Sequence, residues 1–199
     1  MTAGARTVQP PGRPKAAPAA PPGGSEGHAV PSVGARIWHL GADIDTDALA
    51  PGAWMQHGVD VIAQHCLENH LPAFAREVRP GDVIVAGPNF GIGSSREQAA
   101  AALAHLGVAA VIAPSWGGLF FRNAFNLGLL LLTCDDVEAL RPHAVLHLDR
   151  DHCRLSLPDG TPVPLHPVPD FLLDMVRQGG LMAALRARLT QRSPLEIAR

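Results

Sequence analysis

Apolar and polar positions along the chain predict a strand, a helix and a second strand near its middle. Residues 83–86 (VIVA) and 108–113 (VAAVIA) are continuous apolar runs, as expected for strands buried on both faces of a parallel sheet. Between them, residues 98–106 have helical spacing, and Gly107 is placed to end that helix. These lengths are typical of a βαβ unit, whose crossover is right-handed almost without exception. We therefore predict a parallel sheet at the centre of the fold.

The flanking segments extend this sheet and surround it with helices. Residues 35–40 alternate like a half-buried strand, and residues 59–70 have helical spacing. After Asp135 the pattern changes to short strands separated by turns, which is typical of antiparallel pairing. The further elements that we predict are a helix at 117–126, strands at 129–132, 144–148, 154–157 and 163–165, and closing helices from 169 and over 181–189. The predicted fold class is α/β, with a mixed sheet and flanking helices.

Composition divides the 199 residues into one domain with an extension at each end. Residues 1–33 are dominated by Pro, Ala and Gly and cannot bury enough surface to offset the entropy of ordering. We predict a disordered extension there, and not a targeting peptide, because an apolar core or an Arg-rich amphipathic face is missing. Residues 34–190 form the predicted domain, and 191–199 form a tail.

Charge and cysteine usage exclude several classes of function. The net charge of −2 gives no reason to expect nucleic acid as a partner. The sequence also lacks a run of 18 apolar residues, so we do not expect a membrane span. The three cysteines, Cys66, Cys134 and Cys153, are odd in number and widely spaced. That spacing argues against a disulfide framework and against a self-contained zinc or iron–sulfur site. We expect a reducing, cytoplasmic setting and no metal bound by this chain.

Three local patterns raise a metal site as an alternative. Three aspartates at 43, 45 and 47 resemble the start of a calcium loop, but the closing glutamate is missing, so a turn with side chains bonded to their own backbone is favoured. Cys66 and His70 stand four apart on one predicted helix face without other ligands nearby, which favours a packed thiol and a surface imidazole. His143 and His147 share that spacing, but the predicted strand separates them.

The loop after the first buried strand, residues 87–98 (GPNFGIGSSREQ), carries the candidate chemistry. Gly91 and Gly93 let a ligand approach the backbone closely, and the first amides of the following helix favour an anion. Arg96 adds a planar cation suited to a carboxylate. A structural alternative is that Ser94 and Glu97 form a capping box, and the tetrapeptide by itself is more typical of a cap than of catalysis.

Four separated stretches, taken together, resemble one family. The loop 89–97 (NFGIGSSRE) is similar to the signature of the aconitase superfamily's swivelling domain, and in particular to the small subunits of 3-isopropylmalate dehydratase and homoaconitase. Residues 43–51, 113–128 and 169–181 resemble the family's other motifs, in the right order. The resemblance covers nearly everything from Ala35 to Leu189. It implies a swivelling β/β/α domain that docks on a large subunit, and that partner carries a [4Fe-4S] cluster.

The resemblance also implies an activity and its residues. The reaction would be the isomerisation of a small hydroxy-dicarboxylic acid by dehydration and rehydration, first of all 3-isopropylmalate to 2-isopropylmalate in leucine biosynthesis. Ser94 would be the catalytic base, acting as an alkoxide. Ser95 and Arg96 would bind a substrate carboxylate, and iron on the partner would act as Lewis acid. Trp54, in the loop that covers the substrate's side group, would contact an alkyl substituent, with interface or core packing as its alternative.

Departures from the family pattern leave alternatives open. Ile92 stands in place of a usual cysteine, Gln98 in place of a histidine, and Gly118 in place of an arginine. Another substrate, as in homoaconitase or an alkylmalate dehydratase, is one alternative. A catalytically inactive binding subunit is another, from a different class. Dinucleotide binding rests on Gly91-x-Gly93 alone, since Arg96 replaces the third glycine.

Overall fold

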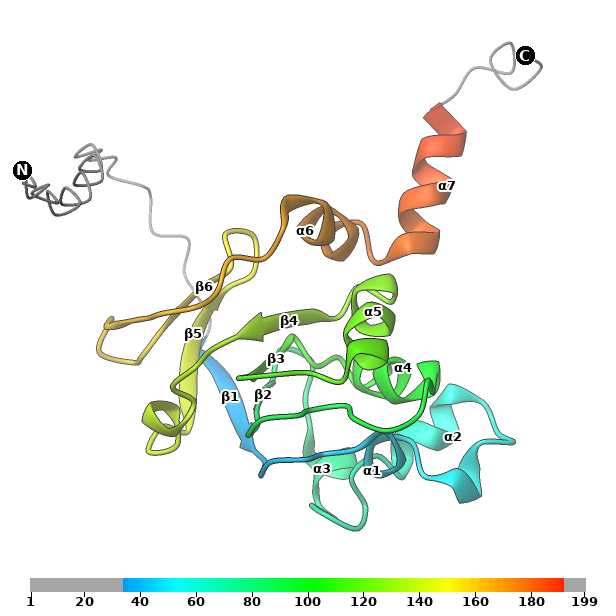
Figure 1. Ribbon diagram of the computed structural model, residues 1–199, viewed down its shortest axis with the longest axis horizontal. Helices are drawn as coiled ribbons and strands as arrows, with labels where there is room; N and C mark the ends of the chain where they lie inside the picture. Colours follow the sequence, from blue (N-terminus) through cyan, green and yellow to red (C-terminus); the bar gives the residue numbers. More distant parts are fainter. Residues whose placement is uncertain (1–33, 192–199) are drawn as a thin grey trace, which may run out of the picture. The chain divides into compact units, whose positions relative to one another are not determined.

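The computed structural model describes residues 34–191, which form one seven-stranded mixed sheet in the order β4-β3-β2-β1-β5-β6-β7 (Figure 1). Neighbouring strands of the first four are parallel, and the remaining pairings are antiparallel. The strands are β1 (Gly34–His39), β2 (Val83–Val85), β3 (Ala110–Ala113), β4 (Leu130–Thr133), β5 (Val145–Asp149), β6 (Arg154–Ser156) and β7 (Pro162–Val163). The predicted extension 1–33 and residues 192–199 of the predicted tail lie outside the described residues.

Helices cover one face of the parallel strands, and a separate core fills the other face. The helical elements are α1 (Thr46–Leu49), η1 (Gly52–Trp54), α2 (Val59–Gln64), α3 (Phe74–Glu77), α4 (Glu97–His105), α5 (Gly118–Asn126), η2 (Glu138–Leu140), α6 (Asp170–Arg177) and α7 (Leu181–Gln191). Ile84 of β2 packs in the helix-side core, whereas Val83 and Val85 pack in the other core with Leu146 of β5 and Leu155 of β6. Both faces of β2 are therefore buried, which explains its continuous apolar sequence.

The predicted fold class is confirmed, and one helix is corrected. The strand, helix and strand around α4 form a parallel unit, and the strands after Asp135 pair antiparallel as predicted. The helix expected over 59–70 ends at Gln64. Leu67 has a positive φ of 61°, and its N–H donates to Ala48 O at 2.8 Å, so a contact with α1 replaces the next helical turn. The strand expected at 163–165 is the shorter β7.

The carboxyl ends of β1, β2 and β3 meet at one edge of the sheet, as parallel strands require. Three loops follow these strands, and backbone hydrogen bonds join them. Asp43 N–H donates to Pro88 O at 2.9 Å, and Gly91 N–H donates to Ile44 O at 2.6 Å. Gly117 N–H donates to Phe90 O at 2.8 Å. This edge thus collects the aspartate motif, the glycine–serine–arginine loop and the start of α5.

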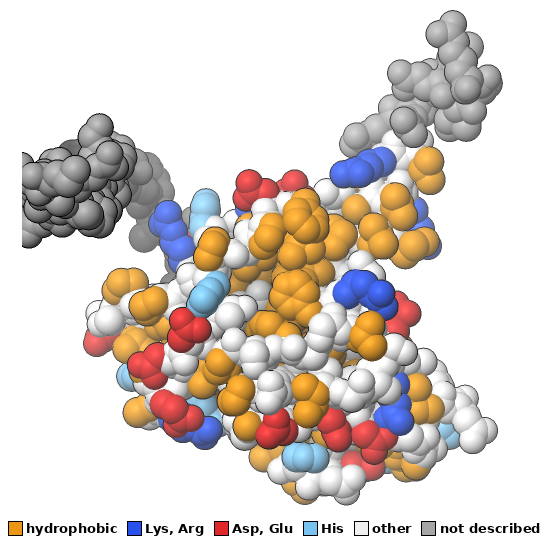
Figure 2. Space-filling model, in the orientation of Figure 1, with side chains coloured by type: hydrophobic (Ala, Val, Ile, Leu, Met, Phe, Trp, Pro, Cys, Tyr) orange, Lys and Arg blue, Asp and Glu red, His pale blue; other side chains and the backbone are white. Residues whose placement is uncertain are grey.

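Apolar side chains remain uncovered on the closing helices. Figure 2 shows orange side chains gathered over α6 and on α7. The large exposed apolar residues there are Phe171, Leu181, Met182, Leu185 and Leu189. Within residues 34–191, no helix has the length and apolar character needed to cross a membrane.

Candidate active site

The glycine–serine–arginine loop has a backbone that only glycine adopts easily at two positions. Gly91 has φ 75° and Gly93 has φ 105°, both in the region that L side chains rarely enter. A Cβ at Gly91 would lie 2.2 Å from Cγ of Phe120, so the loop rests directly on α5. The loop then continues to Ser94 and Ser95, both of which are exposed. The two glycines therefore present these serines at the sheet edge.

Ser94 is held by a residue of the aspartate motif. The Ser94 N–H donates to Thr46 Oγ1 at 3.0 Å, and the two hydroxyl oxygens also lie 3.0 Å apart. Thr46 is 2% exposed, and its own N–H donates to Ile92 O at 2.8 Å. Asp45 N-caps α1 by accepting from Ala48 N–H at 2.7 Å, which places Thr46 in the first turn of that helix. Two loops far apart in sequence thus fix one serine.

The capping-box alternative for Ser94 is wrong. Helix α4 begins at Glu97, and its N-cap is Arg96, which makes no side-chain capping hydrogen bond. Ser94 lies too early in the chain to cap this helix, and its hydroxyl is paired with Thr46. The first backbone N–H groups of α4 therefore do not receive the hydrogen bonds that a capping box of Ser94 and Glu97 would make.

Arg96 is paired with the same small helix. Its Nη1 forms an ion pair with Asp47 Oδ1 and donates to Ala50 O at 3.1 Å. Asp47 also accepts from Gly52 N–H at 3.1 Å. The hydrogen bond from Arg96 lowers the pKa of the Asp47 carboxyl, so this group stays charged at neutral pH. The pairing orients the guanidinium at the edge that carries Ser94.

Helix α5 supports the loop from the other side. Asn123 is 7% exposed, and its Nδ2 donates to Ser95 O at 3.2 Å. Asn89, in the same loop, joins it to the two other loops at this edge, because its N–H donates to Ser115 Oγ and its Nδ2 to Asp43 Oδ1, both at 2.9 Å. The structure therefore brings Ser94, Ser95 and Arg96 to one place on contacts with α1 and α5.

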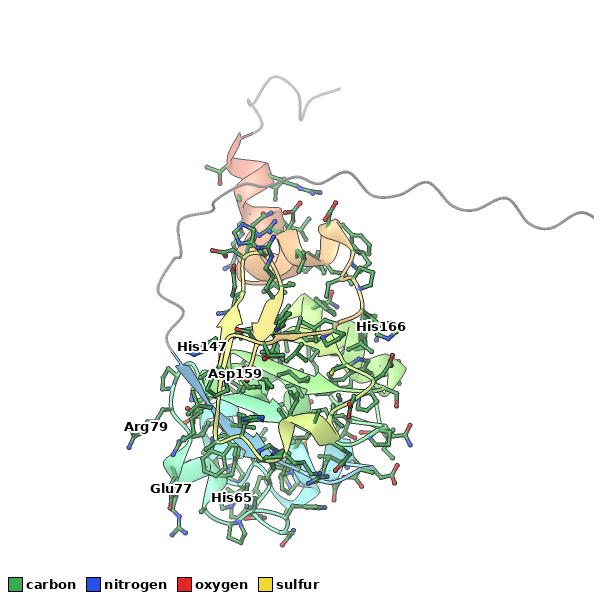
Figure 3. All side chains as sticks on the ribbon, turned by 90° about the vertical axis from the view of Figure 1, so that its left-hand side faces the viewer. His65, Glu77, Arg79, His147, Asp159 and His166 are labelled. Atoms are coloured by element: carbon green, nitrogen blue, oxygen red, sulfur yellow. The ribbon has the colours of Figure 1, made fainter. Side chains whose placement is uncertain are left out.

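Trp54 has partners within its own segment. Its ring stacks on His65, with centroids 3.7 Å apart and planes 10° from parallel, and its Nε1 donates to Glu68 Oε1 at 3.4 Å. It packs half-buried against the helix-side core, and His65 lies at the lower end of the view in Figure 3. These contacts agree with the core-packing alternative for Trp54. The contact of Trp54 with a substrate stays a prediction.

Sequence reasoning missed Thr46 and Asn123 as supports of the site. Thr46 and Ser94 are separated by 48 positions, so local patterns do not connect them. The available signal was the resemblance of residues 43–51 to a family motif, from which we assigned no contact with Ser94. The three aspartates of this motif serve three separate partners: Asn89 for Asp43, the α1 cap for Asp45 and Arg96 for Asp47. They do not converge as calcium ligands.

The departures from the family pattern lie around this arrangement. Ile92 contributes its backbone, through the bond to Thr46 and a bridge to Asp45. A Cβ on Gly118 would meet no heavy atom within 4 Å, so the place of the missing arginine is open. A Cβ on Gly117, by contrast, would lie 2.2 Å from Gly91 O. Glycine at 117 is therefore required by the close contact with the loop.

The part of the chain that the structure describes holds no group of three or more His, Cys, Asp and Glu side chains arranged for a metal ion. Cys66 and Cys134 are buried free thiols, and burial raises the pKa of each. Cys66 is a packed thiol and His70 is exposed, as the non-metal interpretation predicts.

Comparisons with known proteins identify the family. Residues 58–137 match the model of the aconitase C-terminal domain. The chain is 42% identical to 3-isopropylmalate dehydratase small subunit 1 of Archaeoglobus fulgidus over 149 residues, which is 74% of this chain and 92% of that protein. It is 40% identical to the methanogen homoaconitase small subunit of Methanothermobacter thermautotrophicus over 148 residues, covering 74% of this chain and 86% of the relative.

A solved structure agrees with this result. The crystal structure of 3-isopropylmalate dehydratase from Methanocaldococcus jannaschii superimposes with a TM-score of 0.71 and 32% sequence identity, over 79% of this chain and 95% of that chain. The mixed sheet and its flanking helices thus form a known fold. The chain belongs to the family of 3-isopropylmalate dehydratase small subunits, and its fold is that of the aconitase C-terminal, swivelling domain.

Proposed function

We propose that this chain is the small subunit of a hydro-lyase that interconverts 3-isopropylmalate and 2-isopropylmalate by removing and re-adding water. The observation that carries this proposal is the identity of 42% to the A. fulgidus small subunit over nearly the whole of that protein. The site supports it, because the loop with Ser94 and Arg96 is fixed at the sheet edge by α1. The product would serve leucine biosynthesis.

Ser94 acts as the base in this proposal. A proton on a carbon next to a carboxylate is a weak acid, so its removal requires a strong base. The alkoxide of Ser94 takes this proton, and the electrons of the C–H bond form a double bond to the neighbouring carbon. The hydroxyl on that carbon leaves with its electron pair as hydroxide, and this hydroxide together with the proton taken by Ser94 makes up the one water that the acid loses. The reverse steps return water to the other carbon and move the hydroxyl.

Ser95 and Arg96 bind a carboxylate of the acid. Arg96 offers a planar set of donors suited to two carboxylate oxygens, and its pairing with Asp47 holds this set in a fixed direction. The first amides of α4 add partial positive charge at the same point. The substrate is thereby oriented with its acidic C–H bond toward Ser94.

The reaction needs a large subunit. We propose that this partner carries a [4Fe-4S] cluster, which supplies a Lewis acid for the departing hydroxyl when bound. Large apolar side chains are exposed on α6 and α7, and such surfaces are typical of protein–protein interfaces. This exposure supports a chain that works in an assembly. Cys66, Cys134 and Cys153 are free thiols, which supports our proposal that the protein works in the reducing cytoplasm.

A homoaconitase-type activity is the second candidate. The M. thermautotrophicus relative, named as a methanogen homoaconitase small subunit, is 40% identical, close to the value for the isopropylmalate relative. The two activities differ in the side group of the acid. An alkyl group would favour contact with Trp54, whose aromatic ring is half-buried and is stacked on His65 by one face.

The test is an anaerobic assay of this chain with its large subunit after iron–sulfur reconstitution, following the unsaturated acid by ultraviolet absorbance. Isopropylmalate, homocitrate-type acids and smaller alkylmalates are offered in parallel. We expect turnover of isopropylmalate only when both chains are present. Preference for a homocitrate-type acid would establish the second candidate instead. A complex that assembles and turns over none of the acids would indicate a binding subunit without catalysis.

Ser94→Ala should abolish turnover and leave assembly intact. The variant removes the base, so we expect kcat to fall by at least about 10³, in line with the loss of a catalytic proton acceptor. Ser156→Ala on β6, away from the sheet edge, is the matched control and should keep normal kcat. Size-exclusion chromatography reports the complex in each case. Normal kcat in Ser94→Ala would show that another group is the base.

A further inference from the structure

The hydrogen bonds of Thr46 determine where its hydroxyl proton can go. A threonine hydroxyl has one hydrogen to donate and two lone pairs that accept. One lone pair is used by the Ser94 N–H, which donates to Thr46 Oγ1 at 3.0 Å. Ser94 Oγ lies 3.0 Å from the same oxygen. The hydrogen and the second lone pair of Thr46 both remain for Ser94 Oγ, so either hydroxyl can donate while both are neutral.

Loss of the Ser94 proton makes Thr46 the obligatory donor. A neutral Ser94 hydroxyl either donates to Thr46 or accepts from it, because both groups carry a hydrogen. An alkoxide has no hydrogen and only accepts. The bond then becomes Thr46 O–H to Ser94 O⁻, and a hydrogen bond to an ionised acceptor is shorter and roughly twice as strong as a neutral one. Thr46 thus stabilises the anion more than the neutral hydroxyl.

The position of Thr46 is fixed before any reaction. The residue is 2% exposed, its N–H is bonded to Ile92 O, and its carbonyl accepts from Ala50 N–H at 3.0 Å. Gly93 makes room for the hydroxyl, since a Cβ there would come within 3.1 Å of Thr46 Oγ1. A donor that is already oriented costs no reorganisation when charge develops on its partner. Charged groups flank the pair in sequence: Asp45, Asp47, Arg96 and Glu97.

We propose that Thr46 is a positioning residue for the base, which holds Ser94 through its backbone amide and donates its hydroxyl hydrogen to the Ser94 alkoxide. This inference rests on the proposed function, in which Ser94 removes the proton. It adds a second chain segment to the catalytic arrangement, because Thr46 belongs to α1 and Ser94 to the loop after β2. Thr46 touches Ser94 and acts on the substrate only through it.

The experiment compares Thr46→Val, which keeps the shape and removes the hydroxyl, with Thr46→Ser, which keeps the hydroxyl. Both are assayed as the complex with the large subunit. For Thr46→Val we expect kcat to fall by about 10² to 10³, as for the loss of one donor to a developing anion. KM should stay within about threefold. Thr46→Ser should keep most of the activity. Thr133→Val, which removes the hydroxyl that Trp116 Nε1 contacts at 3.0 Å, is the matched control.

The pH profile separates a role in the chemistry from a structural one. If the hydroxyl stabilises the alkoxide, the rise of kcat with pH in Thr46→Val is displaced to higher pH, so that the loss is smaller in alkaline solution. A merely structural defect lowers kcat equally at all pH values. Thermal melting of each variant reports folding, and Thr46→Ala replaces Thr46→Val if the buried valine prevents assembly.

The outcomes also distinguish this inference from the proposed function. Inactive Ser94→Ala together with fully active Thr46→Val would overturn the role of Thr46 and leave the base assignment standing. Equal losses in Thr46→Val and Thr46→Ser with an undisplaced pH profile would also overturn it. An active Ser94→Ala would remove the base itself. A large, pH-dependent loss in Thr46→Val with rescue by Thr46→Ser would establish the role.

Discussion

Arg96 is oriented through one of its terminal nitrogens. Nη1 pairs with Asp47 and donates to Ala50 O, and the guanidinium is a rigid plane. Fixing one nitrogen of such a plane therefore fixes the direction of the remaining donors. The ion pair is partly exposed, since the side chains of Arg96 and Asp47 are 27% and 62% exposed. We therefore assign it a role in orienting the Arg96 guanidinium and not in stabilising the fold.

Arg96→Lys keeps the charge and removes this plane. We expect KM for the hydroxy acid to rise about tenfold, which is ~1.4 kcal/mol of binding, with a smaller effect on kcat. The reason is that a point charge replaces two parallel donors. Steady-state kinetics of the reconstituted complex give both constants, and Arg76→Lys on the exposed surface of α3 is the control. An unchanged KM in Arg96→Lys would place the carboxylate elsewhere.

At this scale the sequence predicts the types of residue in the site and misses the contacts that hold them. The glycines, serines and arginine of the loop are recognisable because they are consecutive. The capping-box interpretation fails because Ser94 has a tertiary partner, Thr46, that competes for its hydroxyl. Local patterns also do not show that Asp47 pairs with Arg96 across 49 positions. Such pairings depend on the meeting of two loops at a sheet edge.

Among the elements, the loop after β2 is packed tightly against helix α5. Gly91 lies against Phe120, and Gly117 lies against Gly91 O. This contact sets how far the loop stands from α5, and with it the position of the serines. A side chain at Gly91 has no room.

Gly91→Ala should therefore destabilise the fold in two ways. A left-handed backbone costs about 1–2 kcal/mol for a residue with a Cβ, and overpacking adds about 1–3 kcal/mol. Gly160→Ala is a matched control, because its φ of 87° brings the same backbone cost but a Cβ there would meet no heavy atom within 4 Å. Urea unfolding should show a greater loss for Gly91→Ala. Equal losses would mean that Phe120 moves aside freely.

The sequence predicts elements well where the cause is local. The apolar runs 83–86 and 108–113 contain the strands β2 (Val83–Val85) and β3 (Ala110–Ala113), because both faces of the parallel sheet are buried there. The helix expected over 59–70 is wrong beyond Gln64, because Leu67 bonds to Ala48 instead of continuing the turn. Its apolar spacing persists through that break, so periodicity alone does not reveal it.

At the scale of the whole molecule, a buried carboxylate ties the first two strands together at the end opposite the candidate site. Asp82 is 5% exposed and lies just before β2. Its Oδ2 accepts from Trp38 Nε1 at 2.8 Å, from Arg36 Nη2 at 2.7 Å and from Arg79 N–H at 2.9 Å. Glu77 and Arg79, near this cluster, lie on the same side of the molecule in Figure 3.

The pKa of Asp82 makes stability depend on pH. Burial by itself raises the pKa of this carboxyl, but the hydrogen bonds from Arg36, Trp38 and Arg79 outweigh burial and lower it. A lowered pKa in the folded state means that the stabilisation is complete above the unfolded value of about 3.9 and is lost as pH falls through the folded value. The fold should therefore lose free energy of unfolding in acid, below about pH 4.

Asp82→Asn tests this argument. At pH 7 we expect the variant to lose about 1–3 kcal/mol of unfolding free energy, because the buried acceptor of the hydrogen bonds from Arg36, Trp38 and Arg79 loses its charge. The difference from the natural chain should shrink as pH falls below about 4, since protonation of Asp82 removes the same charge. Urea unfolding between pH 7 and pH 3 measures both, with the exposed Asp151→Asn as control. A difference that stays constant over this range would mean that the hydrogen bonds, and not the charge on Asp82, join β1 to β2.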